Sequence, residues 1–219
     1  MALQCGIVGL PNVGKSTLFN CLSSAKAESA NYPFCTIEPN IGIITVPDER
    51  LERISDLVNP QKIIPTTVEI VDIAGLVKGA SKGEGLGNQF LGNIRNTNAI
   101  LHVVRCFDDE NITHVDGSVD PVRDKEIIDI ELQFKDLEAI EAKIAKVKKL
   151  ADSGNKESKA IYDVANTIRE VLLQGKSART IEMEETKWDL VKDLNLITAK
   201  PVLYVCNVDD ASVVSGNHH

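Results

Sequence analysis

The chain lacks the features that mark secreted, membrane-spanning and duplex-DNA-binding proteins. No stretch approaches the roughly 18 consecutive apolar residues of a membrane helix, and Met1–Gln4 has neither the basic start nor the apolar core of a signal peptide. Acidic residues outnumber basic ones by 32 to 24, whereas a duplex-DNA-binding domain needs a basic footprint. We therefore expect a cytoplasmic monomer that binds neither DNA duplex nor membrane. Contact with RNA or a ribosome through a local patch stays compatible with this balance.

Cysteine patterns typical of zinc sites are also missing. None of the five cysteines forms a CxxC pair, and no histidine lies at zinc-ligand spacing from any of them. Cys5, Cys106 and Cys206 lie in apolar, strand-like runs, where a free cysteine behaves as a small hydrophobic residue. We predict that these three side chains are buried.

The chain does contain a repeated alternation of short apolar runs and helical segments. Helical segments at 15–22 and 48–57 fall between some of the runs, and such alternation is typical of an α/β fold with a mostly parallel sheet flanked by helices. The runs are nearly continuous in apolar residues, as expected for strands buried on both faces. They span residues 4–8, 41–46, 67–73, 99–106 and 201–206.

Residues 127–196 follow a different, helical period. Two segments carry apolar residues three and four positions apart, and Ser153–Asn155 between them is a helix-stop signal. We predict an antiparallel, coiled-coil-like hairpin inserted into a nucleotide-binding domain made of residues 1–126 and 197–219. Two ordinary surface helices packed on the sheet are the alternative. The periodic residues are Leu137, Ile140, Ile144, Val147 and Ala151, then Ile161, Val164, Ile168 and Val171.

The strongest motif is a phosphate-binding loop of the form G-x-x-x-x-G-K-[ST] at Gly9–Ser16. A predicted strand precedes it and a predicted helix follows it, which is the context the motif requires. Its glycines let backbone N–H groups converge on a phosphate, Lys15 reaches the β- and γ-phosphates, and Ser16 is a Mg²⁺ ligand. We predict that a nucleoside triphosphate is bound here. The contacting residues would be Asn12, Val13, Gly14, Lys15, Ser16 and Thr17.

Two further residues fit the metal site. Asp72 ends a predicted strand and begins D-x-x-G, where a water-mediated Mg²⁺ ligand is needed and the Gly75 N–H can reach the γ-phosphate. Thr36, in the loop before the 41–46 strand, is placed to complete the Mg²⁺ shell. An ordinary loop threonine is the alternative interpretation of Thr36.

The last predicted strand leads into Asn207-Val208-Asp209-Asp210. GTPases of this class carry N-K-x-D here, and the aspartate accepts both guanine N–H groups. Asn207 and Asp210 fit that pattern, but Val208 replaces the lysine. We infer that base recognition differs from that of an ordinary GTPase.

These residues together resemble the YchF/Obg-like ATPase family, related to the translation-factor GTPases. The likeness covers nearly the whole chain and is most specific in Asp72–Phe90 and His114–Pro121. It implies a GTPase-like domain, a coiled-coil insertion and a C-terminal TGS domain, and the chain looks truncated before the TGS part. It also implies ATP binding at least as good as GTP binding, and association with ribosomes, with the large subunit as the expected partner. The matching segments are Gly6–Asn20, Asn31–Asn40, Val71–Leu91 and Cys106–Asp120.

The resemblance also implies roles for single residues. Mg²⁺ falls to Ser16 and Thr36, and adenine lies near Asn207, Val208 and Phe107. Leu76 stands where Ras-like enzymes carry a water-orienting glutamine, so the family's catalytic histidine, here His114, is expected to act with Lys15. The acidic residues around His114 favour a protonated imidazole; a loop-tethering role is the alternative for this residue. Asn12 carries a hypothetical K⁺-binding role.

Four functions remain open at this point. The leading one is a slow Mg²⁺-dependent ATPase switch, and a GTPase is the alternative because Asp210 stands where the family usually has glutamate. A nucleotide-sensing module with negligible hydrolysis is compatible with the missing glutamine. A protein-interaction scaffold built on the helical hairpin is compatible with any of these.

Overall fold

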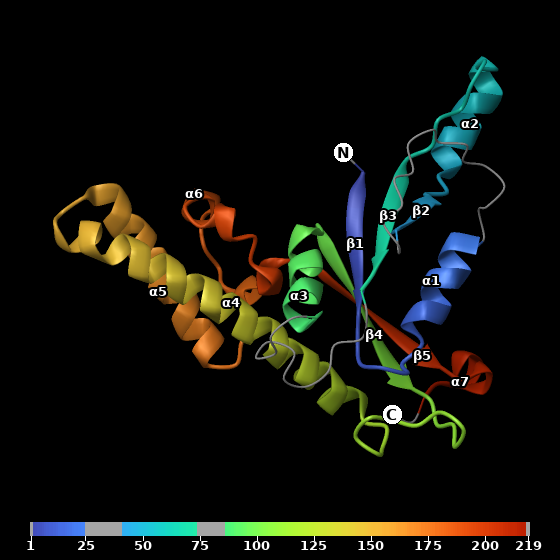
Figure 1. Cartoon of the computed structure of the whole chain (residues 1–219). Helices are drawn as coiled ribbons and strands as arrows, with labels where there is room; N and C mark the ends of the chain where they lie inside the picture. The colour runs from blue at the N-terminus through green and yellow to red at the C-terminus, as the bar shows by residue number, and fades with distance from the viewer. Residues whose placement is uncertain (1, 25–40, 74–85, 218–219) are drawn as a thin grey trace.

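The computed structural model describes residues 2–24, 41–73 and 86–217. Its centre is a five-stranded sheet in the order β2-β3-β1-β4-β5 (Figure 1). β3, β1, β4 and β5 run parallel, and β2 pairs antiparallel with β3 at one edge. This confirms the predicted mostly parallel α/β fold. The strands are β1 (Leu3–Val8), β2 (Ile41–Thr45), β3 (Thr67–Asp72), β4 (Ala99–Cys106) and β5 (Val202–Val208).

Helices flank this sheet and extend beyond it. The described helices are α1 (Lys15–Ser24), α2 (Glu49–Val58), α3 (Leu86–Asn96), α4 (Pro121–Asp152), α5 (Lys156–Leu173), α6 (Glu185–Asp189) and α7 (Asp210–Ser215). Short 3₁₀ turns η1 (Ala178–Thr180), η2 (Lys192–Leu194) and η3 (Ile197–Ala199) lie between α5 and β5. Within the part of the chain that the structure describes, no helix combines the length and apolarity that a bilayer crossing requires.

The inner strands β1 and β4 are largely buried, as their apolar sequences predict, but β2, β3 and β5 are mostly half-buried or exposed. Ile7 and Val8 of β1 and most of β4 are buried. β5 is the last strand of the described sheet, and its Leu203 and Cys206 are exposed. The prediction that Cys206 is buried was therefore wrong, whereas Cys5 and Cys106 are buried as predicted. Apolar composition alone does not distinguish a central strand from an edge strand.

The predicted helical pair is present as α4 and α5, which run antiparallel and project away from the sheet (Figure 1). The chain reverses at Ser153–Asn155, where Gly154 has φ of 89° and the Asn155 side chain accepts a hydrogen bond from Ser158 N at 2.8 Å. An asparagine at this position satisfies an N–H that the first turn of α5 leaves unpaired. The expected stop signal thus ends one helix and begins the next.

α4 belongs to two hydrophobic clusters. Near its start, Ile128 and Leu132 pack with the sheet, and further along Ile140 and Ile144 pack with α5. The helix itself begins at Pro121, capped by the Asp120 side chain, which accepts from Arg123 N at 3.0 Å. Because α4 is continuous through residue 127, no helix end marks the expected start of the insertion, and the domain boundaries stay a prediction.

A buried carboxylate joins α4 to the segment that enters β5. Asp136 is fully buried and accepts hydrogen bonds from Ile197 N at 2.9 Å and from both N and Oγ1 of Thr198 at 2.7 Å. Burial raises the pKa of Asp136, while these hydrogen bonds and the Arg95 charge act in the opposite direction. The carboxylate therefore fixes η3, and with it the start of β5, to the long helix.

We predict that Asp136→Ala lowers the free energy of unfolding by about 3 kcal/mol, because two buried N–H groups and a hydroxyl lose their acceptor. Urea denaturation followed by circular dichroism measures the change. Asp163→Ala, an exposed aspartate on α5, is the control and should shift stability by no more than about 0.5 kcal/mol. Equal midpoints for the two variants would contradict the role given to Asp136.

Candidate nucleotide-binding site

The strand register brings the predicted site residues to one edge of the sheet. Ile7 pairs with Asp72, and Arg105 pairs with Asn207. The phosphate loop follows β1, so Asp72, the loop and Asn207 all lie at the carboxyl ends of neighbouring parallel strands. Ligands of open α/β sheets bind at this edge.

The phosphate loop is packed tightly against β4. A Cβ atom on Gly9 would lie 2.5 Å from the carbonyl oxygen of Val103, so no other residue fits without displacing β4. Leu10 and Val13 are buried and anchor the loop in the core. Lys15 is only 7% exposed, and its Nζ donates to the Leu10 carbonyl at 2.6 Å. A hydrogen bond from Lys15 to the Leu10 carbonyl therefore links the two ends of the phosphate loop.

The Lys15 ammonium is held in an environment that disfavours its charge. Burial lowers the pKa of Lys15 to about 8, and the negative charge of Asp72 acts in the opposite direction. A buried cation with one carbonyl partner gains from any anion that reaches it. This arrangement favours phosphate binding over an inert structural role for Lys15.

The residues expected to hold Mg²⁺ fit a hard cation. Asp72 Oδ1 is buried and has no hydrogen-bond partner among the described residues, which is costly unless a ligand satisfies it. Ser16 is exposed at the start of α1. A carboxylate oxygen and a hydroxyl are the ligand types that Mg²⁺ prefers. Thr36, Gly75 and Leu76, which carry the remaining predictions for this part of the site, lie outside the described residues.

Asn207 joins the base end of the site to the phosphate loop. Its Nδ2 donates to the Val13 carbonyl at 3.0 Å, and a Cβ atom on Gly14 would lie 2.4 Å from the same nitrogen. Gly14 also has φ of 98°, which side chains disfavour. The sequence motif explained Gly14 by the curl of the loop alone; the close approach of Asn207 is a second reason that only the structure shows.

Arg105 is a site residue that sequence reasoning missed. It is 2% exposed at the end of β4, with its guanidinium carbon 4.5 Å from the centre of the Phe107 ring. Its nitrogens donate to the carbonyls of Phe107 at 3.0 Å, Ile112 at 2.9 Å and Asp109 at 3.3 Å. One buried side chain thus shapes the loop from Phe107 to Ile112. The sequence feature that could have identified Arg105 is its position as a charged residue within an otherwise apolar strand.

The other base-site predictions lie nearby. Val208 ends β5 and pairs with Cys106, the residue before Phe107. Asp210 is exposed in the first turn of α7, a helix capped by the Asp209 side chain, which accepts from Ser212 N at 2.8 Å. Phe107 and Val208 therefore lie at the ends of the adjacent strands β4 and β5, and Asp210 follows β5 in the first turn of α7.

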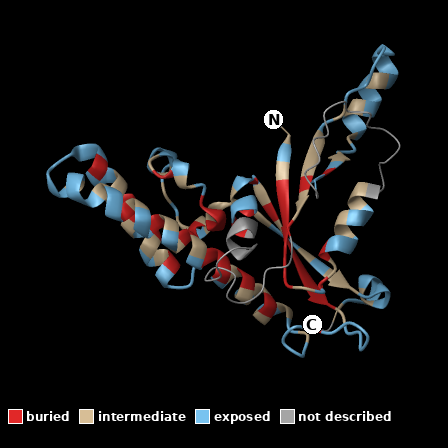
Figure 2. Cartoon of the chain, viewed as in Figure 1, coloured by how far each residue is buried: buried red, intermediate tan, exposed pale blue. Residues whose placement is uncertain are grey.

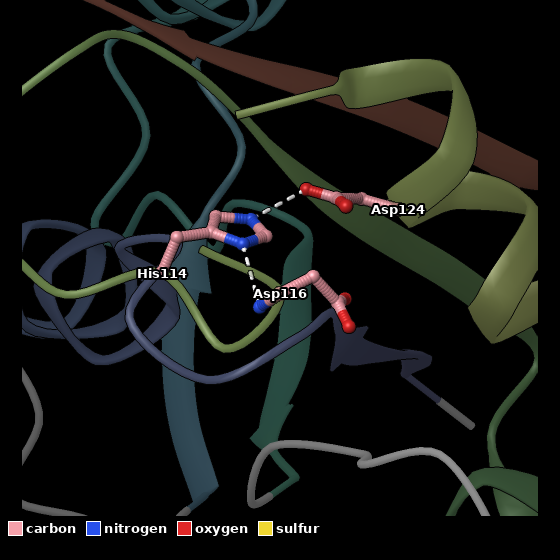
Figure 3. Close-up of side chains that lie close together, drawn as sticks. All are labelled: His114, Asp116 and Asp124. Atoms are coloured by element: carbon pink, nitrogen blue, oxygen red, sulfur yellow. Dashed lines mark hydrogen bonds and ion pairs between the residues drawn. The ribbon is translucent and has the colours of Figure 1, made fainter. Parts of the chain in front are cut away.

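His114 is buried, and both of its ring nitrogens have partners (Figure 3). Its Nε2 lies 2.7 Å from Asp124 Oδ2, and its Nδ1 accepts the backbone N–H of Asp116 at 3.1 Å. Since Nδ1 accepts a hydrogen bond, it carries no hydrogen, and Nε2 is the nitrogen that donates to Asp124. The two hydrogen bonds fix the orientation of the ring.

The His114 loop lies against the phosphate loop. Asn12, which has φ of 60°, donates from Nδ2 to the carbonyl of Thr113 at 3.0 Å. Among the described residues the amide oxygen of Asn12 accepts no hydrogen bond, which is compatible with the hypothetical K⁺ role. Asn12 and His114 are thus brought together through Thr113.

His114, Asp116 and Asp124 offer potential metal-ligand atoms that all lie within 4.8 Å of one another. However, Asp124 Oδ1 accepts from Arg123 Nε at 3.2 Å and Nη2 at 2.9 Å. The Asp116 N–H occupies His114 Nδ1, and a cation placed here would face the Arg123 guanidinium. We interpret the cluster as a hydrogen-bond network and not as a metal centre.

Comparisons with known proteins agree with this geometry. Residues 4–135 match the protein family described as "50S ribosome-binding GTPase". The chain is 55% identical to the "Ribosome-binding ATPase YchF" of Bacillus subtilis, over 100% of this chain and 60% of the relative. It is 51% identical to the protein of that name from Escherichia coli O157:H7, over 96% of this chain and 58% of the relative. The chain thus spans about three fifths of the length of these relatives.

A solved structure is similar over the same extent. The YchF GTPase of Schizosaccharomyces pombe superposes with a TM-score of 0.83 at 38% identity, covering 99% of this chain and 59% of that one. The likeness therefore includes the helical pair as well as the sheet.

We predict that triphosphate binding takes up protons at pH 8. With a pKa of about 8, Lys15 is neutral in roughly half of the free molecules at that pH, and bound phosphates raise its pKa again. Uptake should approach about half a proton at pH 8 and become small at pH 6.5, where Lys15 is already charged. Calorimetric titration of the Mg²⁺–triphosphate complex in two buffers of different ionisation enthalpy measures it. Equal uptake at both pH values would contradict the assignment to Lys15.

Proposed function

Because this chain belongs to the family of 50S ribosome-binding GTPases, we propose that it is the nucleotide-binding part of a Mg²⁺-dependent, ATP-preferring triphosphatase that acts as a switch on ribosomes. The observation that carries the proposal is the alignment at one sheet edge of Asp72, the phosphate loop and an altered base motif. The relatives' names add ATP hydrolysis and ribosome binding. Cytoplasmic location and a monomeric state are part of the proposal.

Each predicted residue has a defined task in this function. Lys15 exchanges the Leu10 carbonyl for β- and γ-phosphate oxygens, which recovers the cost of its buried charge. Asp72 and Ser16 hold Mg²⁺, which neutralises charge that develops on the transferred phosphoryl group. Thr36 and Gly75 complete this end of the site in the proposal. Asn12 additionally binds K⁺ beside the β- and γ-phosphates, and equal turnover in K⁺ and Na⁺ would remove that role.

ATP preference rests on the altered base motif. Val208 cannot supply the alkyl-ammonium side chain of N-K-x-D, and Phe107 offers an aromatic face for stacking at the neighbouring strand end. Asp210 keeps the carboxylate that guanine recognition uses, so a GTP-preferring enzyme is the second candidate. The two differ in the order of their nucleotide affinities.

We predict that calorimetric titration in Mg²⁺ and K⁺ gives tighter binding of ATP than of GTP. Val208→Lys restores the full N-K-x-D pattern with the native Asn207 and Asp210, and should raise the GTP-to-ATP affinity ratio roughly tenfold or more. Val208→Ala, which adds no polar group, should leave the ratio near that of the parent chain. Tighter GTP binding by the parent chain would replace the ATPase assignment with a GTPase one.

We also predict that the chain sediments with 50S particles and not with 30S particles, and that the bound fraction differs between ADP and a non-hydrolysable ATP analogue. A switch requires that nucleotide state changes the affinity for its partner. Lys15→Ala should abolish the nucleotide dependence. Binding that is unaffected by nucleotide and by Lys15→Ala would favour the scaffold function of the α4–α5 pair.

A further inference from the structure

The His114 side chain is buried in an orientation in which it cannot position a water molecule. Its side chain is 4% exposed, and both ring nitrogens already have hydrogen-bond partners (Figure 3). A residue that positions a nucleophile needs a ring nitrogen within hydrogen-bond reach of that nucleophile. In the proposed reaction, His114 must therefore leave at least one of its present partners.

Asp124 is not arranged as a carboxylate that supports a catalytic histidine. Such a carboxylate binds one ring nitrogen and leaves the other directed at the reacting group. Here the second nitrogen, Nδ1, accepts the N–H of Asp116, only two residues further along the same loop. The hydrogen bonds to Asp124 and to the Asp116 N–H together hold the ring in the protein interior, so Asp124 stabilises this buried orientation.

The Asp124 carboxylate is itself firmly held. It lies in the first turn of α4, 3% exposed, and its second oxygen is paired with Arg123. Arg123 donates in addition to the hydroxyl of Ser118 at 3.0 Å and to its carbonyl at 2.6 Å. The acceptor for His114 is thus fixed both to α4 and to the loop before it.

The backbone beside His114 is anchored to the nucleotide site at the same time. Asn12 of the phosphate loop holds the Thr113 carbonyl, and Arg105 holds the Ile112 carbonyl. If the bond to Asp124 breaks, these contacts keep the His114 backbone next to the phosphate loop. The proposed movement is then a rotation of the His114 side chain, with loss of the Asp116 bond, while its backbone stays beside the phosphate loop.

We propose that Asp124 is a positioning residue that restrains hydrolysis by holding His114 in its buried position. The proposal rests on the proposed function, because it requires that His114 contributes to hydrolysis. Breaking the His114–Asp124 hydrogen bond exposes the imidazole and raises turnover. Since Asp124 belongs to α4, which continues into the pair with α5, a displacement of that helix acts on the same bond.

The test compares Asp124→Ala, Asp124→Asn and Asp116→Ala in the 219-residue chain. We expect Asp124→Ala to raise the single-turnover ATP hydrolysis rate roughly tenfold, which is the loss of one strong hydrogen bond, with nucleotide affinity changed less than about twofold. Asp124→Asn keeps a weaker acceptor and should give an intermediate rate. Asp116→Ala is the matched control, because Asp116 contributes only its backbone N–H to the ring.

Two further measurements show whether the effect passes through His114. The double variant Asp124→Ala, His114→Ala should lose the gain and hydrolyse no faster than His114→Ala alone. Nitrogen-15 spectra of the histidine side chains should show protonated Nε2 in the parent chain and in Asp116→Ala, with solvent exchange of that proton faster in Asp124→Ala. This readout does not depend on hydrolysis, and thermal melts identify any variant that has failed to fold.

The outcomes separate this inference from the proposed function. Active parent enzyme with a slower Asp124→Ala variant would overturn the inference alone, because Asp124 would then support catalysis. A gain that survives in the double variant would overturn it as well. If the spectra show faster exchange of the His114 Nε2 proton in Asp124→Ala while the parent chain and every variant fail to hydrolyse ATP, the proposed hydrolysis is refuted. The role given to Asp124 is then refuted as well.

Discussion

The close packing of the phosphate loop against β4 and β5 determines how the site is arranged. A Cβ atom on Gly9 would collide with the carbonyl of Val103 on β4, and one on Gly14 would collide with the amide of Asn207 on β5. A single methyl group at either position would push a backbone or a bonded side chain aside. The loop therefore has one position relative to β4 and β5, and the residues for phosphate, metal and base recognition are aligned as a consequence.

This close packing places several charged groups out of solvent, and each is stabilised differently. Lys15 has one carbonyl partner among the described residues, and burial lowers its pKa to about 8. Arg105 has three carbonyl partners and shapes a loop with them. One oxygen of Asp72 has no partner within the described chain. The incompletely satisfied groups, Lys15 and Asp72, are those proposed to meet ligand charge, which is where unsatisfied buried groups are expected to serve a function.

The long helix α4 connects this edge of the sheet to the helical pair. Asp124 in its first turn holds His114, Ile128 and Leu132 pack with the sheet, and Asp136 holds the approach to β5. Farther along, Ile140 and Ile144 pack against α5. Figure 2 shows buried stretches both on the part of α4 beside the sheet and on the part that projects with α5. The same helix therefore contacts the His114 loop, the segment that enters β5, and α5.

The amino-acid sequence determined the features that depend on neighbouring residues. The phosphate loop, the helix stop at Ser153–Asn155, the order of the strands along the chain and the two antiparallel helices could be predicted from spacing and local propensity. The fold class was confirmed on that basis. The roles of His114, Asp210 and the metal ligands stay predictions, because neither the described structure nor the comparisons contain the nucleotide that would test them.

Tertiary structure decided the features that depend on distant pairs. Asn207 and Val13 are 194 residues apart, and no local pattern shows that the amide of one excludes a side chain from Gly14. The same holds for the exposure of β5, which follows from its edge position in the described sheet. His114 and Asp124 are only ten residues apart, but the turn between them and the start of α4 decide that the ring faces inward. Spacing along the chain identified which residues carry chemistry, whereas packing decided which of their atoms are free to act.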